Sequence, residues 1–235
     1  MLPDLAHRVR LPERMDDPHL DPAAHRHALG ALARVNRVSA TATRAWRRVR
    51  SLPGQGQLRV LDVGCGGGDV VIELAHRAAR WGRALRLVGM DRSPVALDFA
   101  RERAAGIGGG GVAVDFVRGD VGEGLPDGRW DLVLVNLFLH HLPPDAIVAL
   151  LGAVREAGAD LLAQDLVRSR AGYLLAWAGM RLLSRSRVGH VDGPLSVRAG
   201  FTPDELLGLA LDAGLSGARV RRGWPERLIL SWSSP

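Results

Sequence analysis

The chain has 235 residues, 47% of them hydrophobic, which is enough to bury the core of one soluble domain with an N-terminal extension. The formal net charge is +6, but all 31 basic residues are arginines, and they are scattered along the chain. A nucleic-acid-binding face needs clustered basic residues, so the composition argues against nucleic acid as a partner.

Cys65 is the only cysteine, so an intrachain disulfide is excluded, and no Cys-x-x-Cys or Cys/His cluster indicates a zinc site. The N-terminal segment lacks the apolar core of a secretory signal. No apolar stretch reaches the roughly 20 residues that a membrane span needs. These features predict a cytoplasmic, metal-independent protein.

Residues 1–20 carry Pro, Asp and Arg without periodicity, which predicts an extended arm. A helix is expected to begin at Pro22 with Asp21 as its N-cap, because proline is favoured at the first helical position. A second helix is expected from about Ser39 to Arg50. The stretch SLPGQGQ then breaks the chain.

From Leu58 onward, short apolar runs alternate with helical segments. The runs are LRVLDV, LRLVGM, VAVDFV, DLVLVNL and ADLLAQDL, with helices expected at about 69–81, 94–105 and 145–156. Strands buried on both faces and separated by helices predict the parallel sheet of a doubly wound α/β domain. We therefore divide the chain into residues 1–55, an arm with helices, and residues 56–235, the α/β domain.

The region after the fifth strand predicts more helices and a hairpin. RAGYLLAWAGMRLLSRSR predicts an apolar helix flanked by arginines, and VGHVDGPLSVRAG predicts a loop. Another helix is expected from Pro203, because Thr202 is an N-cap and Glu205 completes a capping box, with Gly214 as the stop. ARVRRG and RLILSW, joined by a turn at residues 224–225, predict a terminal hairpin.

The segment VLDVGCGGGD joins a buried strand to a helix through glycines, which let the backbone turn sharply and approach a ligand. A dinucleotide is one candidate ligand. However, the Gly-x-Gly-x-x-Gly pattern, counted from Gly64 and Gly66, has Asp69 at its third glycine. A carboxylate there would face a diphosphate, and Asp62 before the glycines is better matched to an ammonium. The loop therefore favours a cationic ligand.

Two further strands of the predicted sheet lead to acids. Asp91 ends VGMD, where one carboxylate can accept two hydrogen bonds from a ribose diol. Asp120 in RGDVGEG can accept from an exocyclic amine, and Val121 can cover one face of an adenine. Because the carboxyl ends of parallel strands meet at one edge of the sheet, the three acids describe a pocket for a cationic nucleoside.

In their order, VLDVGCGGG, GMDRSP, RGDVGEGLP and DLVLVNLFLHHL resemble the cofactor motifs of class I S-adenosylmethionine-dependent methyltransferases of the small-molecule, ubiquinone and menaquinone type. The resemblance covers about residues 56–232. It implies a Rossmann-like sheet of seven strands with an antiparallel last strand, and S-adenosyl-L-methionine as the cofactor.

The resemblance also implies roles for individual residues. The matches to Asp62, Gly64 and Gly66 surround the methionine part of the cofactor, with Cys65 a small residue in the same loop. The expected ribose, adenine and sulfonium contacts are Asp91 with its neighbour Arg92, Asp120 with Val121, and Asn136.

LFLHHLPP places His140 and His141 just beyond the fourth strand, near the reactive end of the cofactor. A phenol has a pKa near 10, so its methylation benefits from a base, and histidine suits that task. The Asn/Asp-Pro-Pro-aromatic motif of many nitrogen methyltransferases is replaced here by NLFL. Because adjacent residues of an extended chain point opposite ways, we expect His140 to approach the acceptor and His141 to line the cofactor edge. The alternative is that either ring only bonds nearby backbone.

Residues after the fifth strand are expected to complete the acceptor site, within a lid at about 168–201. Asp165 ends that strand, and His190 on the expected loop is a second candidate base. Further candidates for contact with the acceptor are Arg168, Tyr173, Trp177 and Met180. A turn-capping Asp, a solvated Arg and core packing are the structural alternatives for these residues.

These features together predict O-methylation of a small apolar acceptor, a phenol or a polyketide-like hydroxyl. In related enzymes N-terminal extensions cover the cofactor or pair subunits, so a homodimer is one expectation, and Arg37 would reach the cofactor carboxylate or stay solvated. The basic, apolar helix after the fifth strand predicts peripheral membrane contact at most. Two alternatives stay open: C-methylation of a quinone-type precursor, and a non-catalytic S-adenosylmethionine-binding regulatory protein.

Overall fold

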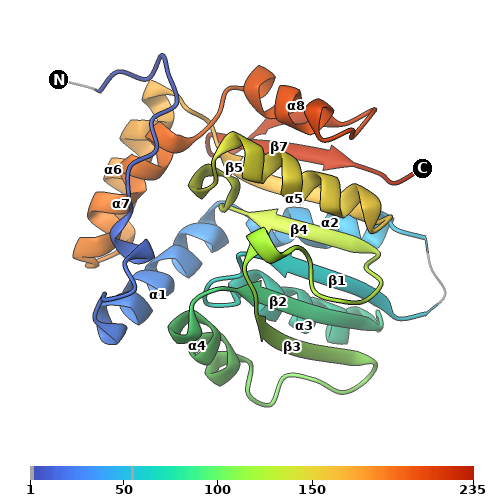
Figure 1. Ribbon diagram of the computed structural model, residues 1–235. Helices are drawn as coiled ribbons and strands as arrows, with labels where there is room; N and C mark the ends of the chain where they lie inside the picture. The colour runs from blue at the N-terminus through green and yellow to red at the C-terminus, as the bar shows by residue number, and fades with distance from the viewer. Residues whose placement is uncertain (1–2, 54–55) are drawn as a thin grey trace.

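The computed structural model describes residues 3–53 and 56–235, so the predicted break SLPGQGQ and the predicted arm lie partly outside the described residues. One sheet holds seven strands in the order β3-β2-β1-β4-β5-β7-β6 (Figure 1). The strands are β1 (Leu58–Val63), β2 (Leu85–Asp91), β3 (Val112–Arg118), β4 (Leu132–Asn136), β5 (Asp160–Leu166), β6 (Arg219–Gly223) and β7 (Arg227–Trp232). β7 pairs antiparallel with β5 and β6, and the remaining pairs are parallel. The predicted doubly wound sheet with an antiparallel last strand is confirmed.

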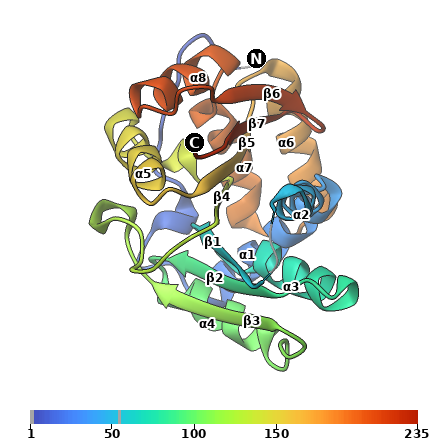
Figure 2. The same cartoon turned by 90° about the vertical axis from the view of Figure 1, so that its right-hand side faces the viewer.

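Helices cover both faces of this sheet (Figure 2). α2 (Thr41–Ser51), α3 (Asp69–Trp81) and α4 (Pro94–Ala104) share one buried apolar cluster with the central strands. α5 (Pro144–Glu156) and α8 (Pro203–Asp212) share a second cluster with the other face. The sheet is therefore buried on both sides, which explains why β4 is apolar along almost its whole length.

Local sequence signals set several helix starts as expected. The Asp21 side chain accepts from the Ala24 N–H at the start of α1 (Pro22–Val38). At the start of α8, Thr202 and Glu205 form the predicted reciprocal capping box. Each cap satisfies backbone donors that have no partner within the helix.

The segment VGHVDGPLSVRAG, predicted as a loop, is instead the helix α7 (Arg187–Ala199). It packs against α6 (Arg170–Leu183) at very close range. A Cβ built on Gly189 would lie 2.3 Å from Met180 Cε, and one on Gly193 would lie 2.7 Å from Met180 Cγ. The two glycines therefore serve helix packing rather than chain breaking, which is why the loop prediction was wrong.

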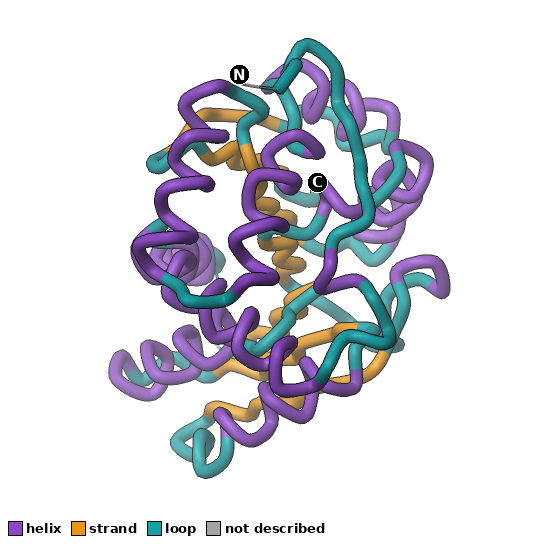
Figure 3. Tube along the Cα trace, turned by 90° about the vertical axis from the view of Figure 1, so that its left-hand side faces the viewer, coloured by secondary structure: helices purple, strands orange, loops and turns teal. Residues whose placement is uncertain are grey.

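The carboxyl ends of the parallel strands are covered by one layer of N-terminal and late segments. α1, α6, α7 and the arm that precedes α1 gather at this edge (Figures 1 and 3). The arm includes the short 3₁₀ turn η1 (Arg14–Asp16), which packs on α7. Among the described residues, no helix is long and apolar enough to cross a membrane. The covering layer encloses the site described next.

Candidate active site

A cavity of about 1020 Å³ lies between the carboxyl edge of the sheet and this covering layer. Its floor includes Gly64, Gly66 and Asp91, and its apolar wall includes Leu29 of α1 and Leu175 of α6. Ligand pockets commonly span about 300 to 1,000 Å³, so this cavity is large enough for a nucleoside and a second small molecule.

The glycine loop is fastened to the end of the next strand by Asp91. Asp91 Oδ2 accepts the Gly66 N–H at 2.8 Å, and Oδ1 accepts the Ser93 N–H at 2.9 Å. Gly64 has φ +67°, and a Cβ there would come within 2.5 Å of the Phe138 ring. Only glycine fits that position, and the resulting concave backbone leaves room for a ligand above it.

Behind the loop, Asp62 is the buried end of a polar chain. Its Oδ1 accepts from Asn136 Nδ2 at 2.8 Å, and Asn136 Oδ1 accepts from Gln164 Nε2 at 2.8 Å. Burial raises the pKa of Asp62 to about 8, although the hydrogen bond from Asn136 opposes that rise. Asp62 and Asn136 lie just behind the cavity lining, and the predicted place of Asn136 close to the sulfonium stays a prediction.

Cys65 also points away from the cavity. It is 6% exposed, and burial raises the pKa of its thiol well above the usual value. The sequence prediction that it is a small structural residue fits this placement better than direct cofactor contact does.

At the other end of the floor, Asp120 and Val121 follow β3 and line the cavity beside Met90. Asp120 Oδ1 accepts the Gly122 N–H at 2.8 Å, which shapes the 3₁₀ turn η2 (Val121–Glu123). Arg92 also lines the cavity, and its guanidinium pairs with Asp16 of the arm at 3.0 Å. The predicted ribose and adenine residues are therefore brought to one side of the cavity.

The two histidines are adjacent in a 3₁₀ turn, η3 (Leu139–His141), instead of an extended chain. Their ring centroids are 4.2 Å apart, and both residues line the cavity. The extended chain assumed for this segment is wrong, and a 3₁₀ turn does not alternate side chains as a strand does, so both rings line the cavity.

Asp165 orients His140. His140 Nδ1 lies 2.7 Å from Asp165 Oδ1, and the His140 backbone N–H donates to Oδ2 at 3.2 Å. Burial would raise the pKa of Asp165, but His140 and the Leu166 N–H hold it below its usual range. Asp165 is 1% exposed and outside the cavity lining, where it holds the His140 ring in place from behind.

The arm supplies acids that sequence reasoning missed. Glu13, 8% exposed, lies 3.8 Å from His140 Nε2 and 4.0 Å from His141 Nε2. Asp16 Oδ2 is 3.1 Å from His141 Nδ1. Burial disfavours the charged ring of His141, yet the hydrogen bond to Asp16 and the nearby Glu13 raise its pKa above the usual value. No periodicity in residues 1–20 indicated this role.

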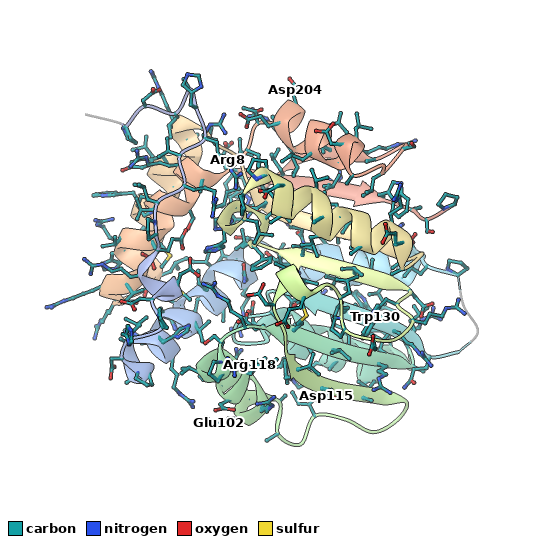
Figure 4. The ribbon with its side chains drawn as sticks, viewed as in Figure 1. Arg8, Glu102, Asp115, Arg118, Trp130 and Asp204 are labelled. Atoms are coloured by element: carbon teal, nitrogen blue, oxygen red, sulfur yellow. The ribbon has the colours of Figure 1, made fainter. Side chains whose placement is uncertain are left out.

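Arg8, labelled on the arm in Figure 4, ties that segment to the histidine turn. Its Nη2 donates to the carbonyls of Leu139, His140 and Leu142, and its Nε donates to that of Ala199. Asp192 of α7 accepts the N–H groups of Arg14 and Met15. The arm is thus a fixed wall of the cavity.

Several predicted site residues lie elsewhere. His190 is on α7, with Nε2 2.7 Å from the Ser184 carbonyl, and lies outside the cavity lining. Arg168 is buried in a bidentate pair with Glu205. Arg37 is exposed and lies outside the lining. The structure therefore does not bring His190, Arg168 or Arg37 to the cavity, and their roles as base, acceptor contact and cofactor contact stay predictions.

The roof of the cavity uses a different face of α6 from the one expected. Trp177 is 46% exposed, with the Arg181 guanidinium 4.2 Å from its ring, and neither Trp177 nor Tyr173 lines the cavity. Met180 does line it, as expected. The α6 residues facing inward are Gly172, Leu175, Ala176, Gly179, Met180 and Leu183. These residues are spaced three and four positions apart, so they share one face of the helix. The sequence prediction chose another face because it followed the aromatic residues Tyr173 and Trp177.

Comparisons with known proteins agree on the kind of domain. Residues 60–158 match the model of a methyltransferase domain. The ubiquinone biosynthesis O-methyltransferase of Hahella chejuensis is 34% identical over 133 residues, covering 55% of this chain and 50% of that protein. The corresponding protein of Ralstonia nicotianae is 32% identical over 167 residues, covering 69% and 65%. The chain therefore spans about half the length of the first relative and less than two thirds of the second.

Human N-acetylserotonin methyltransferase, solved with S-adenosylmethionine, superposes with a TM-score of 0.63 at 18% identity, covering 92% of this chain and 57% of that one. At that identity the likeness shows a shared fold. The fold is an α/β domain. The carboxyl edge of its sheet carries the glycine loop, Asp91 and Asp120, which are suited to a nucleoside cofactor. Residues 60–158 therefore form a methyltransferase domain, and the relatives and the fold support a class I S-adenosylmethionine-dependent methyltransferase.

Proposed function

We propose that the protein transfers the methyl group of S-adenosylmethionine to a hydroxyl of a small apolar aromatic acceptor, with His140 as the base. The observation that carries this proposal is the bond of 2.7 Å between His140 and the buried Asp165, because His140 lines the cavity that also contains the glycine loop. The names of the two curated O-methyltransferase relatives support oxygen as the methylated atom.

The residues at the sheet edge fit the cofactor. The concave backbone at Gly64 and Gly66 accommodates the methionine part, and each Asp91 oxygen keeps a lone pair for a ribose hydroxyl. Asp120 and Val121 line the same cavity and would recognise the adenine. When bound, the cofactor supplies an electrophilic methyl group on a cationic sulfur.

His140 would hold its acceptor-side nitrogen ready for a proton. Asp165 accepts from Nδ1–H, so the lone pair lies on Nε2, on the cavity side. Positioning contributes strongly to an in-line displacement, and the apolar faces of α1 and α6 would hold an aromatic ring against the methyl group. The acceptor hydroxyl loses its proton to Nε2 as its oxygen attacks.

The test begins with calorimetric binding of S-adenosylmethionine and S-adenosylhomocysteine to the wild type and to Asp91→Ala. Asp91→Ala is expected to weaken binding about 100-fold or more, because it removes charged hydrogen bonds to the ribose and the anchor of the Gly66 N–H. Asp98→Ala is the matched control, since Asp98 is an exposed acid of α4 paired only with Arg101.

A screen of phenols and polyketide-like hydroxyls with methyl-labelled cofactor then tests transfer. Methylated oxygen in the product, located by NMR, supports the proposal, and a new carbon–carbon bond would support the quinone-precursor alternative instead. Cofactor binding by the wild type without transfer to any acceptor would support the regulatory alternative. Action in the cytoplasm on a free small molecule, and pairing as a homodimer, stay predictions.

Cofactor binding is also expected to release a proton at pH 6.5. Below about pH 8 the buried Asp62 carboxyl holds a proton, and a neighbouring ammonium favours its ionised form. The complex then holds fewer protons than the free protein, so affinity rises with pH up to about 8. Calorimetry in buffers of different ionisation enthalpy measures the release. Asp62→Asn should abolish it, and equal heats for the wild type in all buffers would contradict this prediction.

A further inference from the structure

Both histidines of η3 have their Nδ1 atoms engaged by carboxylates. His140 Nδ1 is 2.7 Å from Asp165 Oδ1, and His141 Nδ1 is 3.1 Å from Asp16 Oδ2. A carboxylate accepts, so each Nδ1 carries the hydrogen and each Nε2 presents a lone pair. Carboxylate–histidine pairs of this kind orient imidazoles that bind metal ions.

Both Nε2 atoms face Glu13. The separations are 3.8 Å from His140 to Oε1 and 4.0 Å from His141 to Oε2, too long for hydrogen bonds. Two ligand atoms that each lie about 2.1 Å from an ion are at most about 4.2 Å apart, so both pairs are within bridging range. One donor atom from each of the three residues lies within 4.8 Å of the others.

Glu13 is held in place by groups from other segments. Its Oε1 accepts from Ser196 Oγ at 2.6 Å, and the backbone directly after it is anchored by Asp192. Only one Glu13 oxygen is used in this way. Among residues 3–53 and 56–235, no hydrogen-bond donor lies on Glu13 Oε2 or acceptor on either Nε2. Glu13 Oε2 and both Nε2 atoms are therefore preorganised and free, and Glu13 Oε1 keeps its second lone pair.

The surrounding charge favours a cation. Glu13, Asp16 and Asp165 all lie against the two imidazoles. Arg92 pairs with Asp16, Arg8 and Arg10 donate to backbone carbonyls of the turn, and the charges of Arg8 and Arg227 act on Asp165. Among the described residues Glu13 has no arginine partner, so its carboxylate is the charge that a divalent ion at the two Nε2 atoms would neutralise.

We propose that Glu13, His140 and His141 form a binding site for a divalent transition-metal ion such as Zn²⁺. Two imidazole nitrogens and one carboxylate oxygen are a donor set suited to Zn²⁺, Co²⁺ or Fe²⁺, with remaining positions open to the cavity. This goes beyond the proposed function and changes the sequence expectation of a protein without a metal. An ion on Nε2 takes the lone pair that His140 needs as a base, so metal loading inhibits methyl transfer; this consequence alone rests on the proposed function.

The test is calorimetric titration of chelator-stripped full-length protein with Zn²⁺, together with the visible spectrum of Co²⁺ added to it. One ion per chain and a Co²⁺ spectrum with nitrogen ligands are expected. Glu13→Gln should weaken binding at least about 10-fold, because it removes the anionic ligand. Asp17→Asn is the matched control, a neighbouring cavity acid outside the cluster, and should bind as the wild type does.

NMR of the wild type keeps the test independent of any folding defect in Glu13→Gln. Zn²⁺ should shift the Nε2 resonances of His140 and His141 and leave that of His190 unchanged. Failure to bind one ion per chain, or a shift elsewhere, would overturn the site.

Methyl transfer is measured separately with and without Zn²⁺. Inhibition that a chelator reverses supports the site and the base together. Faster transfer by the Zn²⁺-bound protein supports the site and removes His140 as a free base. Transfer by a protein that binds no Zn²⁺ overturns the metal site and leaves the proposed function standing.

Discussion

Replacing His140 with glutamine is expected to lower the single-turnover rate of methyl transfer by about 10²- to 10⁴-fold, the usual contribution of a positioned base. Glutamine keeps a side chain of similar length but cannot take a proton from the acceptor. Cofactor affinity should stay close to that of the wild type, because the residues proposed to bind the cofactor are on the glycine loop and at the ends of β2 and β3. Rates are measured with saturating cofactor and a chelator present.

Two variants separate the base from a general effect on folding. His190→Gln removes a ring bonded to the Ser184 carbonyl outside the cavity, and should transfer at the wild-type rate. Asp165→Asn keeps the volume but no longer fixes the Nδ1–H tautomer, and should also be slow. A His140→Gln protein within about threefold of the wild type would remove His140 from the proton-transfer step.

Arg168→Met is expected to cost about 3 kcal/mol of folding free energy. The guanidinium is 1% exposed, pairs with both Glu205 oxygens, and donates to the carbonyls of Leu5, Ala6 and Gly200. Methionine fills most of the volume but leaves these carbonyls without their donor. The Glu205 side chain is 40% exposed, so water can hydrate its carboxylate when Arg168 is removed. The loss of folding free energy is therefore smaller than for a fully buried charge left without a partner.

Urea unfolding measures this loss, with Arg170→Met as the control because Arg170 is exposed at the start of α6. Cofactor affinity of the folded Arg168→Met protein should match the wild type, since the residue lies outside the cavity. A stability change below about 1 kcal/mol would contradict the structural role assigned to Arg168. A selective loss of acceptor binding would restore the original sequence prediction for it.

Local signals explain why much of the fold could be predicted from the sequence. The strands are short apolar runs between helices, and Asp21 and Thr202 cap helices by bonding the adjacent backbone. The glycine loop and Asp91 were also predictable, because each follows a strand whose carboxyl end must lie at the shared edge.

The rest depends on packing between distant segments. Gly189 and Gly193 look like helix breakers until Met180 is packed on them. The sequence predicts Trp177 as an acceptor contact in the roof, but the structure places it on the side of α6 that faces away from the cavity. Glu13 stands in an aperiodic arm and reaches the histidines only because Arg8 and Asp192 fasten that arm across the sheet edge. No pattern within a single segment carries this information.

The position of the arm across the sheet edge affects how proteins with this domain could change their substrate. The residues matched to the methyltransferase domain, 60–158, contain the floor of the cavity and the histidine turn. The facing wall comes from the arm, α1, α6 and α7, all outside that span. Chains that share the same central domain can therefore diverge in the molecule they modify by exchanging only these flanking pieces. A chain trimmed to residues 60–158 would lack the wall of the cavity that faces the glycine loop.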